Sequence, residues 1–115
     1  MIGNIKDLQK HEVTHPAALN AAMKVLVSPS EGWEGYVMRV VEVEVGGFTP
    51  RHSHPWPHIN YMIEGEGYVL YDNELKEVES GSFAFIPSGM EHQFQNRGNK
   101  VFKFICIVPE EGHKL

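Results

Sequence analysis

The feature that most constrains the fold of this chain is a series of short apolar segments separated by Gly, Pro and Asn. The clearest segment, KVFKFICIVP at residues 100–109, alternates between two sets of side chains. One set consists of Phe102, Phe104, Cys106 and Val108. Successive side chains of a β-strand point to opposite faces, so this period of two predicts a strand. Lys103 belongs to the other set, which marks that set as the outer face and the Phe102 set as the core face.

Similar segments recur along most of the chain. They occupy residues 23–28, 35–47, 58–65, 68–71, 75–80, 82–87 and 92–96. In the second of them Glu42 and Glu44 alternate with valines, which predicts that both glutamates face solvent. Many short strands with turn residues at their joints are typical of all-β sandwiches and barrels. We therefore expect one all-β domain over residues 23–115, preceded by an N-terminal arm over residues 1–22 that packs on the barrel or on another subunit.

Three histidines stand close together in RHSHPWPHINYMIEGEG, which runs from residue 51 to residue 67. His52 and His54 are two residues apart, so on a strand they point to the same face. Two prolines then interrupt the strand, because proline cannot donate a hydrogen bond to a sheet, and His58 opens the next strand. Side chains on either side of such a corner can converge on one point. Neutral imidazole is a good ligand for transition metals, so the spacing predicts a metal site rather than three exposed loop residues.

A second stretch, GSFAFIPSGMEHQFQN at residues 81–96, has the pattern G-x5-P-x-G-x2-H-x3-N. Counted from Gly46, the first stretch has the pattern G-x5-H-x-H-x3-H-x6-G. Together they resemble the two signature motifs of the cupin family, in the right order, with one departure. The resemblance covers roughly residues 23–109. It implies a double-stranded β-helix, or jelly-roll, cupin barrel that holds a metal ion inside it.

Carried over residue by residue, the resemblance implies that His52, His54 and His92 are metal ligands. The departure is His58, which stands where the family usually has a ligand glutamate. One alternative is that the site has lost a ligand and is metal-free; the other is that the chain is similar to a minority of small cupins with four histidine ligands. We favour the second, because histidine is itself a ligand. Four neutral imidazoles leave a divalent ion its full charge, which makes it a stronger Lewis acid than one with a glutamate ligand.

The identity of the metal is open from the sequence. We expect one divalent transition metal, with Mn or Fe favoured by the resemblance and Zn, Ni or Cu as alternatives. The four histidine positions also do not identify the reaction. We expect a metal-dependent, dioxygenase-like oxidoreductase that acts on a small molecule. The alternatives are a non-redox isomerase, lyase or decarboxylase, and a non-catalytic module that binds a small ligand or metal. No catalytic residue is identified beyond the ligands.

Several residues around the motifs have two interpretations. Trp56 either walls the pocket or packs in the Pro-Trp-Pro corner. Cys106 is expected in the core, and near a redox metal it is also a candidate for oxidation. Glu64 shares the parity of His58 and is a weak candidate for an inward-facing base. The remaining pocket-or-core candidates are Tyr61, Phe83, Phe85 and Phe94.

Other residues are expected to have structural or surface roles. We expect Pro87 and Asn96 to shape the loop and turn that flank His92, and His11, His15 and His113 to be ordinary exposed side chains. No Arg or Lys is expected on the histidine face, so a carboxylate substrate is not specifically indicated.

Composition excludes several classes of function. A net charge of -5 with interspersed charges gives no basic face for nucleic acid. No apolar run approaches the length of a membrane span, and the first residues carry no apolar signal region. A single cysteine excludes an internal disulfide framework, and we therefore expect a cytoplasmic protein. The resemblance, together with unassigned N-terminal residues and unpaired sheet edges, predicts a homodimer.

Overall fold

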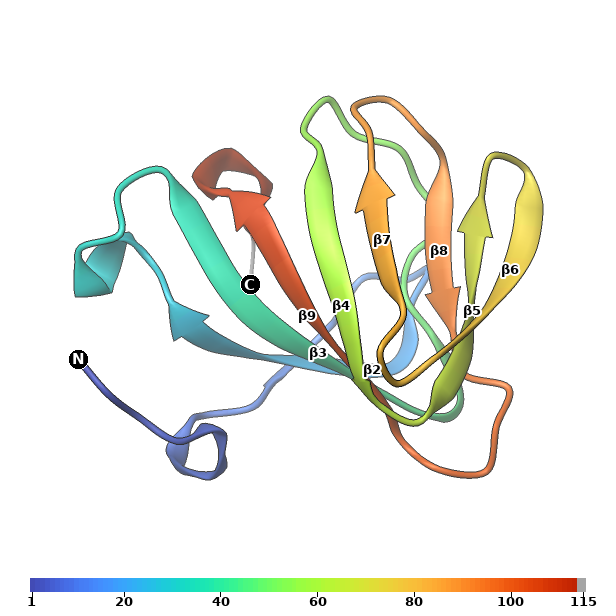
Figure 1. The fold of residues 1–115 in the computed structure, drawn as a ribbon, viewed down its shortest axis with the longest axis horizontal. Helices are drawn as coiled ribbons and strands as arrows, with labels where there is room; N and C mark the ends of the chain where they lie inside the picture. The colour runs from blue at the N-terminus through green and yellow to red at the C-terminus, as the bar shows by residue number, and fades with distance from the viewer. Residues whose placement is uncertain (114–115) are drawn as a thin grey trace.

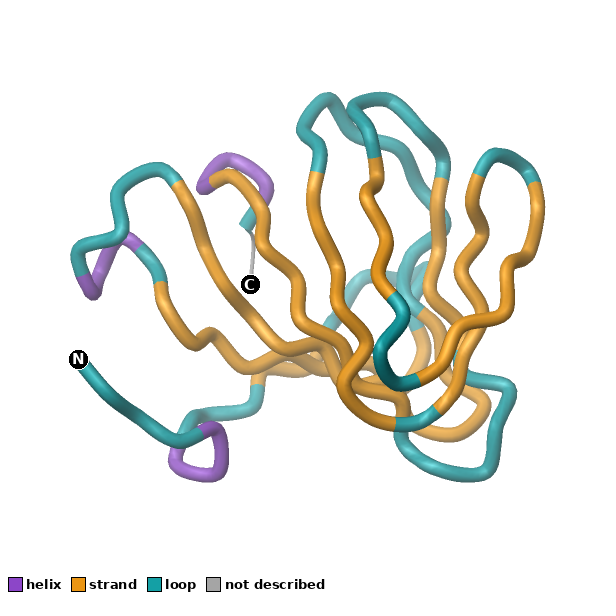
Figure 2. Tube along the Cα trace, viewed as in Figure 1, coloured by secondary structure: helices purple, strands orange, loops and turns teal. Residues whose placement is uncertain are grey.

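Nine antiparallel strands make up the fold of residues 1–113, the part of the chain that the computed structural model describes. The strands are β1 (His11–Glu12), β2 (Leu19–Val27), β3 (Tyr36–Phe48), β4 (His58–Glu64), β5 (Glu66–Tyr71), β6 (Glu74–Glu79), β7 (Phe83–Ile86), β8 (His92–Gln95) and β9 (Phe102–Pro109). Three single-turn 3-10 helices, η1 (Ile5–Asp7), η2 (Pro29–Glu31) and η3 (Glu110–Gly112), complete the regular structure of the described chain (Figure 2). Within residues 1–113, no helix has the length and apolar character needed to cross a membrane.

The strands pair in the order β6-β5-β8-β3-β9-β4-β7, with β2 added to β3 and β1 added to β2. The long strand β3 connects the two parts of this sheet. It pairs with β9 over residues 36–43 and with β8 where Phe48 faces Gln95. The sheet therefore folds back on itself: β2, β3, β9 and β4 lie at the left and centre of Figure 1, and β8, β5 and β6 stand at the right. This nearly closed antiparallel barrel confirms the all-β jelly-roll prediction.

The first strands differ from the expectation. β2 begins at Leu19 rather than at residue 23, because Ala21 and Ala22 are buried where they pair with Val43 and Glu42 of β3. The short strand β1, which was not expected, pairs with β2. The proposed division into an arm over 1–22 and a domain over 23–115 thus falls within β2, and it stays a prediction.

The core lies between the two parts of the sheet. Most of its side chains come from the inward faces of β3, β4, β7, β8 and β9, as expected from the period-two patterns. The largest members are Met62, Ile86, Phe94, Phe102 and Phe104. The alternation along β9 is confirmed at every position, since Phe102, Phe104, Cys106 and Val108 are buried and their neighbours are only partly covered.

Glu42 is an exception to the pattern, because it is buried instead of facing solvent, with 7% of its surface exposed. Its carboxylate lies 3.1 Å from the Lys10 ammonium group and 4.0 Å from that of Lys103. Lys103 stands directly opposite Glu42 on β9, and Ala22 stands opposite it on β2. The outer face of β3 is covered here by its neighbours and by the N-terminal segment, and a buried carboxylate is tolerated because it is paired.

The turn between β4 and β5 is formed by Gly65, whose φ of +81° lies in the left-handed region. A Cβ atom at this position would collide with the backbone carbonyl of Val101. Glycine is therefore required at this position for two reasons. One is its backbone conformation, and the other is the close approach of the segment just before β9. Just before this turn, the pairing of β4 with β9 shifts between Met62 and Glu64, which is the signature of a β-bulge.

Candidate metal centre

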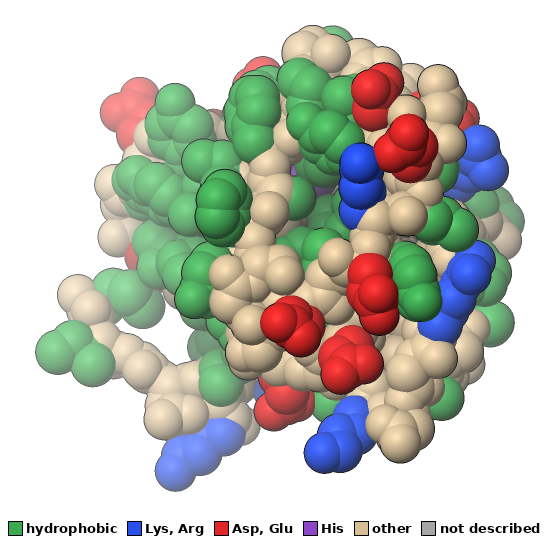
Figure 3. Space-filling model, turned by 45° about the vertical axis from the view of Figure 1, so that its right-hand side comes forward, with side chains coloured by type: hydrophobic (Ala, Val, Ile, Leu, Met, Phe, Trp, Pro, Cys, Tyr) green, Lys and Arg blue, Asp and Glu red, His purple; other side chains and the backbone are tan. Residues whose placement is uncertain are grey.

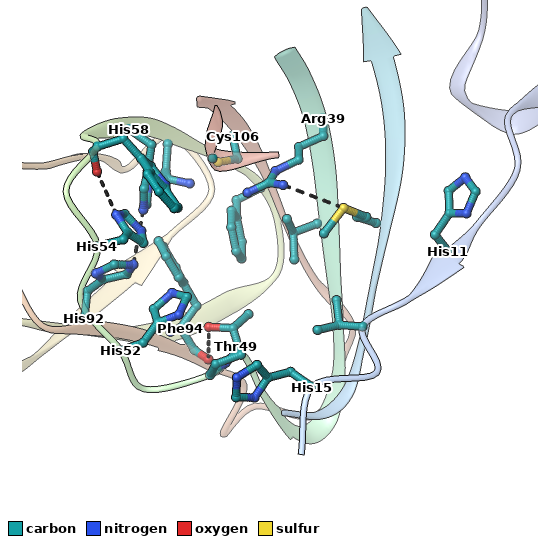
Figure 4. A pocket seen from close by; sticks show the side chains of 18 of the residues that line it. His11, His15, Arg39, Thr49, His52, His54, His58, His92, Phe94 and Cys106 are labelled. Atoms are coloured by element: carbon teal, nitrogen blue, oxygen red, sulfur yellow. Dashed lines mark hydrogen bonds between the residues drawn. The ribbon is translucent and has the colours of Figure 1, made fainter. Parts of the chain in front are cut away.

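A cavity of about 520 Å³ opens into the barrel, and histidines line one side of it (Figure 4). The inner wall is apolar, with Phe94 and Phe104 stacked at a ring-centroid distance of 4.2 Å. The segment 11–15 lines the cavity as well, although it is distant in sequence from the motifs. This size is within the range of about 300–1,000 Å³ that is usual for small-molecule sites.

The backbone holds the histidines in place through contacts between the two motifs. His52 and His92 form an isolated antiparallel bridge, with N–H to carbonyl distances of 3.2 Å and 2.9 Å. The carbonyl of His54 accepts a hydrogen bond from the amide of Gly89 at 2.8 Å. His58 and His92 are the first residues of β4 and β8. The two sequence motifs therefore meet in space at the same end of the barrel.

All four predicted ligands gather at this point, but they are not equivalent. Potential ligand atoms of His52, His54 and His92 lie within 4.8 Å of one another. His58 lies beside this group of three rather than inside it. Its Nε2 atom is 3.2 Å from Nε2 of His92, and its ring centroid is 5.2 Å from that of His54.

Hydrogen bonds at Nδ1 orient three of the four rings. His54 donates from Nδ1 to the Trp56 carbonyl at 2.7 Å, and His92 donates to the Met90 carbonyl at 2.9 Å. With the Asn60 amide placed so that its oxygen faces the ring, His58 donates to Oδ1 at 2.6 Å. A carbonyl oxygen can only accept, so the proton of each neutral ring sits on Nδ1 and the Nε2 lone pair is free. A hydrogen bond at the ring nitrogen that does not bind the ion is typical of histidines that bind metals.

The electrostatics of the cluster favour neutral rings. Burial, reinforced by repulsion from His92, lowers the pKa of His58 to about 3. Burial also lowers the pKa of His92. The pKa of His52, the most exposed of the four, falls to about 4 through partial burial and repulsion from His92. Neutral imidazole is the form that binds a cation, and the two facing Nε2 lone pairs of His58 and His92 lack a proton between them, so this donor set fits a divalent metal ion.

Both interpretations of Trp56 apply to its observed position. Its ring stacks on the His54 ring at 4.8 Å with an interplanar angle of 11°, and it also lines the cavity. A Cβ atom on Gly112 would collide with this ring, so the glycine lets the C-terminal turn pack closely against it. Trp56 is therefore both a packed corner residue and a wall of the pocket.

Two expectations about charged groups near the site are wrong. Arg39 lines the cavity, although no Arg or Lys was expected there. Its inward direction follows from its parity with Val41 and Val43, a signal that the sequence contains. Glu64, in contrast, is exposed and lies 3.4 Å from the Lys103 ammonium group. The bulge after Met62 breaks the parity of β4 and turns this glutamate outward.

The structure also separates the aromatic candidates. Phe94 is buried in the cavity wall, whereas Phe83, Phe85 and Tyr61 are exposed on the outer face by 80%, 55% and 48%. Cys106 is buried and lines the cavity, as expected for a core residue; its oxidation stays a prediction.

Of the three remaining histidines, His15 is exposed as expected, whereas His11 and His113 are partly buried. His11 and His15 line the cavity, and His113 is partly buried beside Arg39. Asn96 shapes its turn as expected. Its side-chain amide group donates to the carbonyls of Val43 and Lys100 at 2.8 Å each.

Comparison with known proteins identifies relatives of this chain. Residues 39–108 match the model of the cupin domain family. The chain is 38% identical over 74 residues to an uncharacterised protein of Methanocaldococcus jannaschii, covering 63% of this chain and 59% of that protein. It is 28% identical over 98 residues to the tetracenomycin polyketide synthase protein TcmJ of Streptomyces glaucescens, covering 78% of this chain and 66% of that protein. The chain thus spans about three fifths to two thirds of the length of these curated relatives.

Solved structures show the same architecture. The polyketide cyclase RemF from Streptomyces resistomycificus superposes with a TM-score of 0.89 at 27% identity, covering 95% of this chain and 78% of that one. A predicted oxalate decarboxylase from Thermotoga maritima superposes with a TM-score of 0.87 at 18% identity, covering 95% and 98%, and this likeness concerns the fold alone. The paired motifs, the jelly-roll barrel and the domain match over residues 39–108 agree, and the chain belongs to the cupin family.

Proposed function

We propose that this cupin is a metal-dependent enzyme in which four histidines hold one divalent ion. The four are His52, His54, His58 and His92. The observation that carries the proposal is that the four rings lie close together and that three of them, those of His54, His58 and His92, give Nδ1 to a hydrogen-bond acceptor and leave Nε2 for a cation. A bound ion would supply Lewis acidity toward a carbonyl oxygen.

The reaction that we favour is non-redox chemistry on an enolisable carbonyl compound. The similarity to TcmJ and to RemF, two proteins named for polyketide synthesis and cyclisation, supports this class. Phe94 and Phe104, which stack on each other, line an apolar wall that would exclude water from a bound substrate. Among the described residues no buried carboxylate lines the cavity, since Glu64 faces outward and Glu12 is exposed, so no general base is assigned.

The oxygen-using oxidoreductase and the non-catalytic binding module stay predictions of the sequence. Neutral imidazoles accept Mn, Fe, Zn, Ni and Cu, and their intrinsic preference follows the Irving–Williams order. The identity of the bound metal therefore separates the redox and non-redox alternatives better than the ligand set does. The cytoplasmic location also stays a prediction.

Metal content and oxygen dependence test the proposed function together. Untagged protein is expected to contain close to one equivalent of a divalent metal by plasma mass spectrometry. Metal at about 100 times its Kd should raise the free energy of unfolding by about 2.7 kcal/mol over the chelator-treated protein. The loaded protein should also accelerate proton–deuterium exchange at the α-carbon of a β-keto ester under nitrogen, measured by NMR.

The outcomes distinguish the alternatives. Exchange that is equally fast in the chelator-treated protein would contradict the metal-dependent reaction. If the protein contains Fe, Mn or Cu and consumes oxygen in the presence of the same ester, it is an oxidoreductase instead. A protein that takes up no metal even after reconstitution would overturn the proposed site.

We also propose that the protein forms a homodimer through the outer face of β4 and β7. Ile59 pairs with Phe85 and Tyr61 pairs with Phe83, so four exposed apolar side chains lie side by side next to the unpaired edge of β7. Figure 3 shows many hydrophobic side chains gathered at the left of this face, whereas most of the charged side chains in view lie at its right and bottom. An apolar patch beside a free strand edge is a typical association surface.

Light scattering at micromolar concentration tests the dimer. The wild-type protein is expected to have twice the mass of the chain, and Phe83→Glu is expected to be monomeric, because it places a charge in the centre of the apolar face. Val45→Glu is the matched control, since Val45 is also apolar and exposed but lies on β3, outside this face. A monomeric wild-type protein would refute the proposal.

A further inference from the structure

The wall of the cavity carries one fixed positive charge. Among the residues that the structure describes, Arg39 is the only Lys or Arg that lines it. The residue lies on β3 opposite Cys106 of β9, and its side chain points into the cavity (Figure 4). Val37 and Val41, which share its face of the strand, are buried in the core. The sheet therefore carries a permanently charged group into apolar surroundings.

The hydrogen bonds of Arg39 leave one edge of its guanidinium group unused. Nη1 lies 3.2 Å from Nδ1 of His113 and 3.9 Å from the sulfur of Met23. Nε is buried and has no hydrogen-bond partner within the described residues. Buried donors are nearly always satisfied, so a buried donor without a partner, on a side chain that lines a cavity, indicates a partner that is not part of the chain.

No carboxylate of residues 1–113 neutralises this charge. Arg39 forms no ion pair with the described acidic residues, and Glu12, the one acidic residue among those that line the cavity, is exposed. A partly buried arginine such as Arg39, in apolar surroundings, is normally paired with an anion. The edge formed by Nε and Nη2 matches the two oxygens of a carboxylate, which it can bind with two parallel hydrogen bonds.

The rest of the cavity wall indicates what kind of group should carry the carboxylate of such a ligand. The stacked rings of Phe94 and Phe104 lie in the same wall, together with Val41 and Met23. These side chains offer mainly dispersion contacts; the only polar atom among them is the sulfur of Met23, a weak acceptor that Arg39 already contacts. An inorganic anion would leave this surface bare, whereas an organic acid with a flat apolar body would cover it.

We propose that Arg39 is the anion-binding end of the cavity and that the ligand is an organic carboxylate whose apolar body lies on the aromatic wall. The histidine cluster lines the same cavity, so the carbonyl of the ligand would be held there, and this second contact rests on the proposed function. The substrate class is then a carboxylic acid with an enolisable carbonyl group. Because the histidine ligands are neutral, a bound divalent ion would keep its full charge. This ion and Arg39 would together attract anions into the cavity.

Benzoate and its neutral isostere benzamide test the Arg39 contact in chelator-treated, metal-free protein at pH 7.5. Binding is measured by calorimetry and by the NMR signal of the Arg39 Nε–H group. Benzoate is expected to bind the wild-type protein and shift this signal, and Arg39→Met is expected to weaken benzoate at least about tenfold through loss of two charge-assisted hydrogen bonds. Benzamide should bind both proteins equally. Arg39→Lys should retain part of the affinity, because it keeps the charge but not the two-pronged geometry.

Arg51→Met is the matched control, since Arg51 is exposed and paired with Glu91 at 3.0 Å. It should leave benzoate affinity unchanged. Equal affinity of benzoate for wild type and Arg39→Met, in variants whose thermal unfolding shows a folded protein, would overturn the proposal, as would a failure of benzoate to bind the wild type. Because no metal is present in this experiment, its result is independent of whether the histidine cluster binds an ion.

Discussion

His92→Ala is expected to weaken metal binding about 100-fold. His92 is the centre of the cluster, with its ring centroid 4.7–4.9 Å from those of His52, His54 and His58. Structural zinc sites with four ligands bind with about 10–16 kcal/mol, so one ligand contributes about 3 kcal/mol, or about 100-fold in affinity. Competition between the protein and a chromogenic chelator for Zn²⁺ measures this loss.

Two further variants make the result specific. His58→Ala should weaken Zn²⁺ binding by a similar factor if the histidine that replaces the family's glutamate is a true fourth ligand. His15→Ala should leave affinity unchanged, because His15 is exposed and its Nδ1 accepts a hydrogen bond from the amide of Ala17. A loss for His92→Ala without a loss for His58→Ala would establish a three-histidine site, in agreement with the tighter grouping of His52, His54 and His92. Undiminished affinity of His92→Ala would contradict the site altogether.

Gly65→Ala is expected to lower the free energy of unfolding by about 4 kcal/mol. A non-glycine residue in a left-handed conformation costs about 1–3 kcal/mol, and overpacking adds about 1–3 kcal/mol. Here both apply, since φ is +81° and a Cβ atom would collide with the Val101 carbonyl. Urea denaturation of the metal-free protein measures the change, and a loss of this size corresponds to a fall in Tm of roughly 15 °C for a domain of this length.

Gly81→Ala separates the two causes. Gly81 has a similar φ of +95°, but nothing lies within 4 Å of the position its Cβ atom would take. In this variant only the left-handed backbone conformation should lower the free energy of unfolding, by about 1–2 kcal/mol. If Gly65→Ala proves no more destabilising than Gly81→Ala, the close approach between the β4–β5 turn and Val101 has no energetic consequence.

Local spacing in the sequence predicted most strands and part of the histidine cluster. His52 and His54 share a face by strand geometry, and the alternation along β9 was sufficient to place Cys106 inside. In these cases, residues close together in the sequence determine the result. His92 is distant in sequence from the other three histidines, and it was assigned through the resemblance of the second motif to that of the cupin family.

The errors arose where a distant segment decides which face of a strand is covered. Glu42 was expected in solvent, but Lys10 and Lys103 approach it across the sheet. Glu64 was considered as an inward base, but a bulge in its pairing with β9 turned it out. Arg39 is an error of a different kind, because its parity with Val41 already places it on the inward face of the strand and this local signal was overlooked.

The cavity is assembled from two parts of the chain with different sequence constraints. The histidines and Arg39 stand on β3, β4 and β8 or on the connections that join the strands, where a change disturbs the barrel. Residues 11–15 and Gly112, which line the same cavity, lie near the beginning and the end of the described chain. Evolution can therefore exchange these flanking segments and diversify ligand preference while the barrel and its histidines remain intact. Homologues with the same four histidines but different flanking segments are the natural set in which to look for new substrate ranges.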